Sequence, residues 1–231
     1  MNDQHPRVAS FDAVLFDLDG TLCRRTQDTD AMYERTFERA GETPFGAPED
    51  LWEALEGPPD HDDTVGYFAA GFTRVAATCG RSDADPIALA RALLAVIDDG
   101  AVTFLPGAEE AVACAAAAGP IGVVTNGPED RQRTKLESLG VADEFDVIVY
   151  AADLPRSKPH ALPFERALDV LGVEPADALY VGNSLAYDVA GAQNAGLSAA
   201  WLRGDADAGA YEPEYVIDSL AELPAILEGN R

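Results

Sequence analysis

The sequence predicts a doubly wound α/β fold, in which a parallel sheet carries helices on both faces and an all-helical domain is inserted after the first strand. Short apolar runs alternate with helical stretches from Pro106 to the end of the chain. The first apolar run, Ala13–Phe16, has no polar position, as expected for a strand buried on both faces. Between about Arg24 and Phe104 the pattern is helical throughout, so the alternation is interrupted there.

The other core strands are predicted where apolar residues stand together again. These runs cover 121–124, 147–150, 179–181, 198–201 and 215–217. The helices between them end before glycines, which adopt the left-handed conformation that closes a helix. They cover 106–118, 128–139, 161–171 and 186–195. A last helix is expected to begin near Ser219, with Glu222 three residues later forming a capping box.

The interrupting segment reads as a bundle of four helices. They cover 30–40, 48–56, 63–79 and 86–98, separated by clusters of glycine and proline. Aromatic residues recur in it at helical spacing and are predicted to form its core. They are Trp52, Tyr67, Phe68 and Phe72. We therefore expect a core domain of residues 1–23 and 105–231 and an inserted helical domain of residues 24–104.

The charge of the chain excludes two classes of partner. The 231 residues include 16 basic and 41 acidic side chains, a formal net charge of −25, which repels nucleic acids and anionic lipid surfaces. Only Lys135 and Lys158 are lysines, and the other basic residues are arginines. This composition indicates a salt-rich cytoplasm, where surface carboxylates are screened. An acidic protein from an ordinary cytoplasm is the alternative.

The cysteines and histidines predict no disulfide and no site of their own. The three cysteines are far apart and show no CxxC spacing, which indicates a reducing compartment. Cys23, close to the first strand, is interpreted as a packing residue. The N-terminus lacks the features of a signal peptide and no apolar run is long enough to span a membrane, so we expect a cytoplasmic protein. A monomer and a homodimer are both open. Three histidines are too scattered to bind a metal together: His5, His61 and His160.

Polar residues follow four of the predicted strands, at the edge of the sheet where open α/β proteins bind ligands. They are Asp17, Asp19 and Thr21 after the first strand, Thr125 and Asn126 after the second, Lys158 after the third, and Asn183 and Asp188 after the fourth. Each alone has an ordinary explanation as a turn residue or a helix cap. Together, with one of only two lysines among them, they indicate a site for an anion.

These residues resemble a known family. The ordered set DLDGTL, VVTNG, SKPH and VGNSLAYD is similar to the four motifs of the haloacid dehalogenase-like (HAD) hydrolase superfamily, whose core is Rossmann-like. The helical insertion after the first motif resembles the C1 cap of that family. The stretch TNGPEDRQRTKLESLG followed by FDVIVYA is similar to phosphatases that act on small phosphorylated metabolites.

The resemblance implies a two-step phosphoryl transfer. Asp17 would attack phosphorus and form an aspartyl-phosphate. Asp19 would protonate the leaving oxygen and then deprotonate the water that cleaves the intermediate. Other side chains and backbone amides would bind the oxygens of the transferring group. The residues implied for this role are Thr21, Thr125, Asn126 and Lys158.

The resemblance also implies Mg2+ as the cofactor, because two carboxylates do not approach a phosphate dianion without a compensating charge. The implied ligands are the Asp17 carboxylate, the Asp19 backbone carbonyl and the side chains of Asn183 and Asp188. Asn183 stands where the family usually has an aspartate, and this departure bears on the affinity for the metal.

The leading hypothesis is a Mg2+-dependent phosphomonoester hydrolase with a small phosphorylated substrate. A haloacid dehalogenase on the same fold is one alternative, but displacement of a halide needs no proton donor, and Asp19 favours the phosphatase. A phosphomutase keeps both aspartates and returns the phosphoryl group to the substrate. A protein that binds a phosphorylated metabolite without turnover is the third alternative, with Asn183 as the mark of lost catalysis.

Overall fold

The computed structural model describes residues 11–57, 63–204 and 207–229, and the chain divides into two units. A core unit contains Met1–Arg25 and Val102–Arg231, and a helical unit contains Thr26–Ala101. The divisions differ by two or three residues from the expected ones. The reason is a short antiparallel ladder at positions where the sequence pattern predicts helix: Cys23–Arg25 (β2) pairs with Val102–Phe104 (β3).

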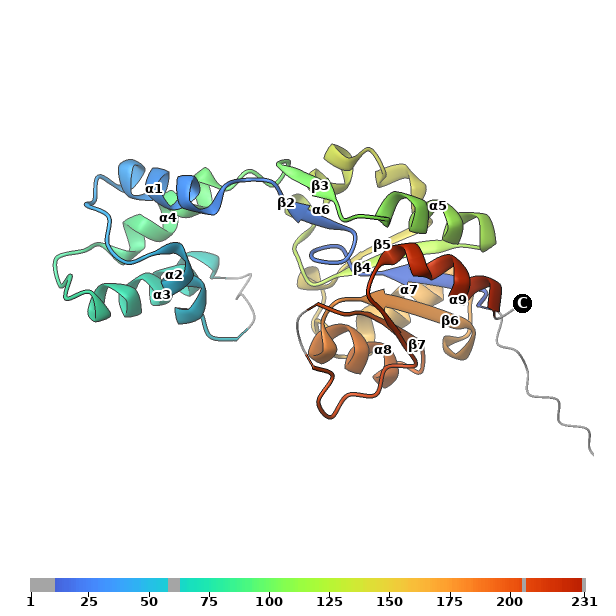
Figure 1. Cartoon of the computed structure of the whole chain (residues 1–231). Coiled ribbons are helices and arrows are strands. Elements are labelled where there is room, and N and C mark those ends of the chain that lie inside the picture. The colour runs from blue at the N-terminus through green and yellow to red at the C-terminus, as the bar shows by residue number, and fades with distance from the viewer. Residues whose placement is uncertain (1–10, 58–62, 205–206, 230–231) are drawn as a thin grey trace, which may run out of the picture. The chain divides into compact units, whose positions relative to one another are not determined.

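A six-stranded sheet forms the centre of the core unit (Figure 1). All of its neighbouring strands are parallel, as predicted. In spatial order they are β5 (Val147–Tyr150), β4 (Ile121–Thr125), β1 (Ala13–Phe16), β6 (Ala178–Gly182), β7 (Ser198–Leu202) and β8 (Tyr215–Ile217). The first strand of the chain therefore lies in the middle of the sheet.

The helices of the core unit follow the predicted segments. They are α5 (Ala108–Ala118), α6 (Glu129–Leu139), α7 (Leu162–Leu171), α8 (Ala190–Asn194) and α9 (Leu223–Gly229). One difference lies after β6, where a π-helical turn, Leu185–Val189, precedes α8 in place of the first half of a regular helix. A 3-10 turn, Leu220–Glu222, leads into α9, and the Glu222 carboxylate accepts from the backbone N–H of Ser219 at 2.9 Å, as the capping-box pattern predicted.

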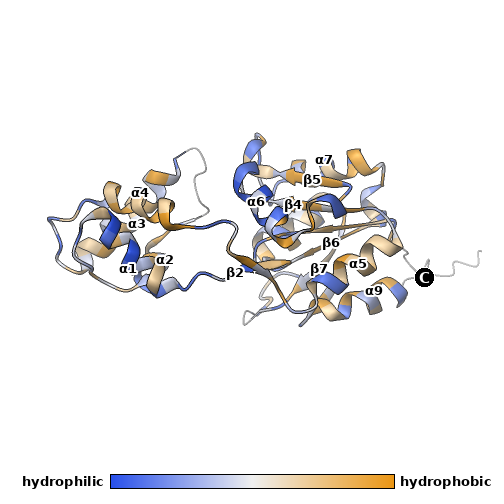
Figure 2. Cartoon of the chain, turned by 90° about the horizontal axis from the view of Figure 1, so that it is seen from above, coloured by the Kyte–Doolittle hydropathy of each residue, from blue (hydrophilic) through white to orange (hydrophobic). Residues whose placement is uncertain are grey.

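The helices cover both faces of the sheet, which confirms the doubly wound fold. Val14 and Phe16 of β1 pack in one hydrophobic cluster with residues of α5, α6 and α9. Leu15, between them in sequence, packs in another cluster with residues of α7 and α8. Figure 2 shows the hydrophobic colouring of the strands and the hydrophilic colouring of much of α6. The central strand β1 is therefore apolar along its whole length because it is buried on two sides.

The helical unit contains α1 (Thr29–Ala40), α2 (Pro48–Ala54), α3 (Thr64–Thr78) and α4 (Pro86–Val96). Phe68 and Phe72 are buried in its core, as predicted, and Tyr67 is partly buried. The prediction for Trp52 is wrong, because its side chain is 40% exposed. Leu51 is the residue of α2 whose side chain is fully buried. Trp52 is one position further round the helix, and its ring makes an edge-type contact with the ring of Phe68.

No helix in the described parts of either unit has the length and hydropathy needed to cross a membrane.

Candidate active site

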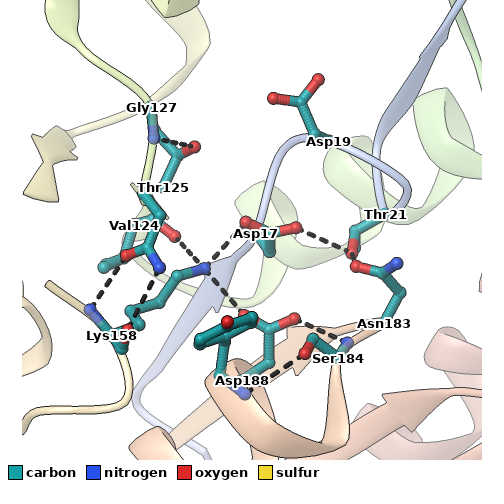
Figure 3. Close-up of polar contacts among 12 residues, drawn as sticks. Asp17, Asp19, Thr21, Val124, Thr125, Gly127, Lys158, Asn183, Ser184 and Asp188 are labelled. Atoms are coloured by element: carbon teal, nitrogen blue, oxygen red, sulfur yellow. Dashed lines mark hydrogen bonds and ion pairs between the residues drawn. The ribbon is translucent and has the colours of Figure 1, made fainter. Parts of the chain in front are cut away.

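The candidate active site lies where three neighbouring strands end. β4, β1 and β6 are adjacent and parallel, so their carboxyl ends share one edge of the sheet. Asp17 directly follows β1, Thr125 is the last residue of β4, and Asn183 directly follows β6. Figure 3 shows these residues facing a common space. The topology therefore gathers residues that are more than a hundred positions apart in the sequence.

Asp17 is buried and bonded through both carboxylate oxygens. Its Oδ1 accepts from Lys158 Nζ at 2.8 Å, and its Oδ2 accepts from the hydroxyl of Thr21 at 3.3 Å (Figure 3). Burial raises the pKa of Asp17 to about 6, because the charge of Lys158 only partly offsets burial and the charge of Asp188 adds to it. Asp17 is therefore ionised at neutral pH, and its carboxylate is poorly solvated, as suits a nucleophile.

Lys158 is the centre of a buried polar cluster. Its Nζ lies 2.8 Å from Asp17 Oδ1, 2.7 Å from Asp188 Oδ1, 2.8 Å from the Tyr180 phenol oxygen and 3.0 Å from the Val124 carbonyl oxygen. Burial lowers the pKa of Lys158, but the two carboxylates outweigh it and the pKa stands above its usual value. The lysine is therefore a permanent cation at the strand ends.

Asp188 bonds within this cluster through both of its oxygens. Oδ1 accepts from Lys158, and Oδ2 accepts from the backbone N–H of Ser184 at 2.8 Å. The π-helical turn after β6 carries Asp188 and buries it. The structure thus shows Asp188 as a partner of Lys158, and its role as a metal ligand stays a prediction.

Asp19 points to a different lysine. Its side chain is about half exposed, and both carboxylate oxygens accept from Lys135 Nζ, at 2.7 and 2.6 Å. Gln132 Nε2 donates to Asp19 Oδ2 at 2.9 Å. Burial raises the pKa of Asp19, but Lys135 and Gln132 outweigh it, and the pKa lies below its usual value. The two aspartates of the first motif therefore have separate cationic partners.

Thr125 and Asn126 connect the end of β4 to these groups. The Thr125 hydroxyl accepts from Gln132 Nε2 at 2.5 Å and from the backbone N–H of Gly127 at 3.4 Å. The Asn126 side chain accepts from the backbone N–H of Lys158 at 2.9 Å and donates to its carbonyl oxygen at 3.1 Å. Asn126 therefore holds the segment that carries Lys158, a contact that the sequence did not predict.

Two of the oxygen atoms expected to bind Mg2+, from Asp17 and Asn183, both contact the hydroxyl of Thr21. Thr21 Oγ1 lies 3.3 Å from Asp17 Oδ2 and 3.2 Å from Asn183 Oδ1, so these two acceptors share its one hydrogen. Gly20 permits this approach, because its φ is +78° and a Cβ there would lie 2.6 Å from the Asn183 amide nitrogen. In residues 11–57, 63–204 and 207–229, no three His, Cys, Asp or Glu side chains are grouped to hold a metal. A cation here would need amide and backbone oxygens as well, which Mg2+ accepts, so the donor set fits it.

Sequence patterns do not single out three further functional candidates, which are Gln132, Lys135 and Tyr180. All three are buried polar side chains inside regular elements, where a residue is normally interpreted as part of a helix face or a strand. Lys135 did carry a signal, since it is one of only two lysines. The histidines and Cys23 lie apart from the site chemistry. His160 is exposed, Cys23 is buried with its pKa raised by burial to about 12, and the other two histidines, His5 and His61, are outside the described residues.

Comparison with known proteins decides the family. The haloacid dehalogenase-like hydrolase family matches residues 11–196, which is most of the chain and includes every candidate residue. The chain belongs to this hydrolase family.

Curated relatives of this HAD hydrolase include phosphatases. N-acylneuraminate-9-phosphatase of Rattus norvegicus is 36% identical over 110 residues, which cover 46% of this chain and 44% of the relative. Pyrophosphatase PpaX of Bacillus cereus is 36% identical over 116 residues, which cover 48% of this chain and 53% of the relative. The match thus spans about half the length of these curated relatives.

Solved structures similar to this HAD hydrolase include more than one activity. A HAD phosphatase from Thermococcus onnurineus has 28% identity and a TM-score of 0.69, covering 94% of this chain and 98% of the other. An L-2-haloacid dehalogenase from Xanthobacter autotrophicus has 23% identity and a TM-score of 0.64, covering 95% and 99%. At that identity the second likeness shows the fold alone. Because one fold serves both reactions, the choice between them depends on the site.

Proposed function

We propose that this HAD hydrolase is a Mg2+-dependent phosphomonoester hydrolase that acts on a small phosphorylated metabolite through an aspartyl-phosphate intermediate. One observation carries the proposal: two aspartates, two positions apart at the end of β1, each bond a different buried lysine, Lys158 for Asp17 and Lys135 for Asp19. Displacement of a halide requires only the first aspartate. A second carboxylate with its own lysine supports a reaction that also moves a proton.

Asp17 is the proposed nucleophile. Its Oδ2 lies on the side of Thr21, away from the Lys158 bond of Oδ1, and would form the bond to phosphorus as the substrate oxygen leaves. Lys158 holds the attacking carboxylate in place and offsets negative charge that develops on the phosphoryl oxygens. The hydroxyls of Thr21 and Thr125 and the backbone N–H of Asn126 are the proposed donors to those oxygens.

Asp19 is the proposed general acid and base. In the first step it would give a proton to the leaving oxygen, and in the second it would take a proton from the water that attacks the aspartyl-phosphate, which returns it to its starting form. The Lys135 contact favours the carboxylate form needed in the second step. An incoming phosphate dianion raises the pKa of a neighbouring carboxyl group, which favours the protonated form needed in the first.

Mg2+, when bound, would supply positive charge between the carboxylates and the phosphate. The proposed ligands are the side chains of Asp17, Asn183 and Asp188 and the backbone carbonyl of Asp19. With an amide in place of one acid, this donor set carries less negative charge than one with a further aspartate. We therefore expect a weak site that is filled only at high Mg2+ concentration.

The inserted helical unit is the proposed C1-type cap. Its insertion after the first motif and its all-helical make-up support this role. We also infer a salt-rich cytoplasm for the protein, from the net charge of −25 and the presence of only two lysines.

The test measures release of inorganic phosphate from p-nitrophenyl phosphate and from a panel of sugar phosphates and nucleotides, with Mg2+ and with EDTA, in about 2 M KCl. Asp17→Asn is compared with Asp169→Asn, an exposed aspartate of α7. We expect phosphate release that depends on Mg2+, is lost in Asp17→Asn and is kept in Asp169→Asn. Borohydride reduction of quenched enzyme should convert Asp17 to homoserine, which identifies the aspartyl-phosphate.

Three other outcomes would each overturn the proposal. Halide release from 2-chloropropionate without phosphate release would show a dehalogenase. Transfer of the phosphoryl group to a second position of the substrate, without free phosphate, would show a phosphomutase. Binding of a phosphorylated metabolite with no turnover on the whole panel would show a binding protein.

A further inference from the structure

Helix α6 buries two polar side chains toward the candidate site. Most of this helix is hydrophilic (Figure 2), and its buried residues are Gln132, Lys135 and Leu136. Gln132 is 1% exposed and Lys135 is 4% exposed. A buried ammonium or amide group is costly unless it is bonded, so the partners of these side chains explain why they are there. The two residues are three positions apart and therefore lie on one face of the helix.

Lys135 restricts the rotation of the Asp19 carboxylate. The Lys135 side chain is 5% exposed and the Asp19 side chain 49%, so the buried member of the pair has a set position and the exposed member adapts to it. Two bonds from one nitrogen, at 2.7 and 2.6 Å, reach both oxygens of Asp19. This geometry restricts rotation of the carboxylate more than a single contact would.

Gln132 joins Asp19 to Thr125. One amide nitrogen, Nε2, donates to Asp19 Oδ2 at 2.9 Å and to the Thr125 hydroxyl at 2.5 Å. Gly127 admits the side chain, because a Cβ on Gly127 would lie 2.5 Å from Gln132 Cδ. Since the Thr125 oxygen accepts from Gln132 and from the Gly127 N–H, its own hydrogen is left to donate to a further acceptor.

We propose that Gln132 and Lys135 are positioning residues of the reaction: together they hold the Asp19 carboxylate beside Thr125, and Gln132 turns the Thr125 hydroxyl hydrogen toward the phosphoryl group. The inference rests on the proposed phosphatase function. It gives α6 a task in catalysis beyond packing on the sheet. Neither residue touches the reacting atoms, since each acts through Asp19 or Thr125.

The two residues should have different kinetic signatures. Lys135→Met keeps the length of the side chain and leaves Asp19 half exposed to water, so the fold should survive. It should impair only the proton transfer, which matters for an alkyl phosphate with a strongly basic leaving oxygen and little for p-nitrophenyl phosphate. Gln132→Met should impair proton transfer and should also weaken the hydrogen bond from Thr125 to the phosphoryl group, whatever the leaving group.

The experiment compares kcat/KM for p-nitrophenyl phosphate and for the best alkyl phosphate, together with inhibition by inorganic phosphate. A positioned general acid contributes about 100-fold to 10,000-fold, so Lys135→Met should lower kcat/KM for the alkyl phosphate by about tenfold or more and change that for p-nitrophenyl phosphate by less than about threefold. Lys135→Arg should recover part of the loss. Gln132→Met should lower both and weaken inhibition by phosphate, which Lys135→Met should leave unchanged. Arg133→Met, an exposed position on the same helix, is the matched control.

Phosphate release by the wild-type protein distinguishes a failure of the proposed function from a failure of the positioning role. If the wild-type protein releases no phosphate, the proposed function fails. If it is active and Lys135→Met lowers both substrates equally, raises the alkyl phosphate rate or changes nothing, the positioning role is overturned. Equal inhibition by phosphate in Gln132→Met and the wild type would overturn the proposal that Gln132 orients the Thr125 hydroxyl. Thermal unfolding of each variant shows that the folded protein is being measured.

Discussion

Replacing Asp17 by asparagine should stop turnover and at the same time stabilise the core unit at neutral pH. In the folded protein two carboxylates, Asp17 and Asp188, share the single ammonium of Lys158 in a buried place. Asparagine is nearly the same size, can accept from Lys158 and carries no charge. The substitution therefore leaves a balanced pair of Lys158 and Asp188, while it removes the nucleophile.

The size of the gain follows from the pKa of Asp17. This pKa is about 6 in the folded protein against 3.8 for an ordinary aspartate. At about 1.4 kcal/mol for each tenfold change in proton affinity, ionised Asp17 costs the folded state about 3 kcal/mol at pH 7. Because the folded pKa is raised, the cost is absent below about pH 4, grows as the pH rises toward about 6 and is constant above that. A gain of this size corresponds to about 6 to 12 °C in Tm for a chain of this length.

The unfolding assay needs a fluorescence signal that comes from the core unit alone. The chain has two tryptophans, Trp201 buried in the core unit and Trp52 exposed in the helical unit, so Trp52→Phe leaves only the core reporter. Urea and thermal unfolding of this background, with and without Asp17→Asn, are followed by fluorescence in EDTA at several pH values. Asp169→Asn serves as the control for loss of an exposed charge.

The destabilisation caused by ionised Asp17 should depend on pH in a characteristic way, and two results would refute this cause. The stability difference between Asp17→Asn and its background should vanish near pH 4 and reach its full size above pH 6. A difference that is the same at every pH would show that burial of the Asp17 charge is not its cause. An Asp17→Asn protein that is less stable at pH 7, or that keeps more than a few per cent of turnover without contamination, would also contradict the account.

Three further predictions concern salt, metal and thiols. From about 0.1 M to about 2 M KCl, Tm and kcat/KM should both rise because the net charge of −25 is screened, and a flat response of both would contradict this. Asn183→Asp should lower, and Asp188→Ala should raise, the Mg2+ concentration for half-maximal activity by about tenfold, and unchanged titrations would exclude these residues as ligands. Iodoacetamide should modify exposed Cys79 in the folded protein and buried Cys23 only after unfolding, as peptide mass spectrometry can check.

The sequence predicted the core well because its strands are buried on both faces. The central strand is apolar at every position, Ala13–Phe16, and the helices α5, α6 and α7 are each capped by a glycine. The ladder of β2 and β3 was missed because three residues are too few to show a strand period. The burial of Trp52 was overestimated because helical spacing locates a face only to within a residue, and α2 is short.

The candidate site was predictable where its residues follow strands and are joined by short motifs, as with Asp17 and Asn183. The structure brings all eight of the predicted residues to one edge of the sheet. Gln132 and Tyr180 could not be predicted, because their partners are set by side-chain direction at long range. Asp188 is predicted to bind Mg2+. In the structure it accepts a hydrogen bond from Lys158, which lies thirty positions away in the sequence and which the strand pattern does not pair with it.

The placement of the two lysines has a practical consequence for handling the protein. Both lysine side chains, Lys135 and Lys158, are bonded to site carboxylates and almost fully buried. Reagents that attach dyes, beads or crosslinkers to lysine amines therefore have no surface lysine to react with on the folded chain, and the N-terminal amino group is the remaining amine that they can modify. Peptide mass spectrometry separates that modification from one at Lys135 or Lys158, so modification of either lysine reports that the site has opened.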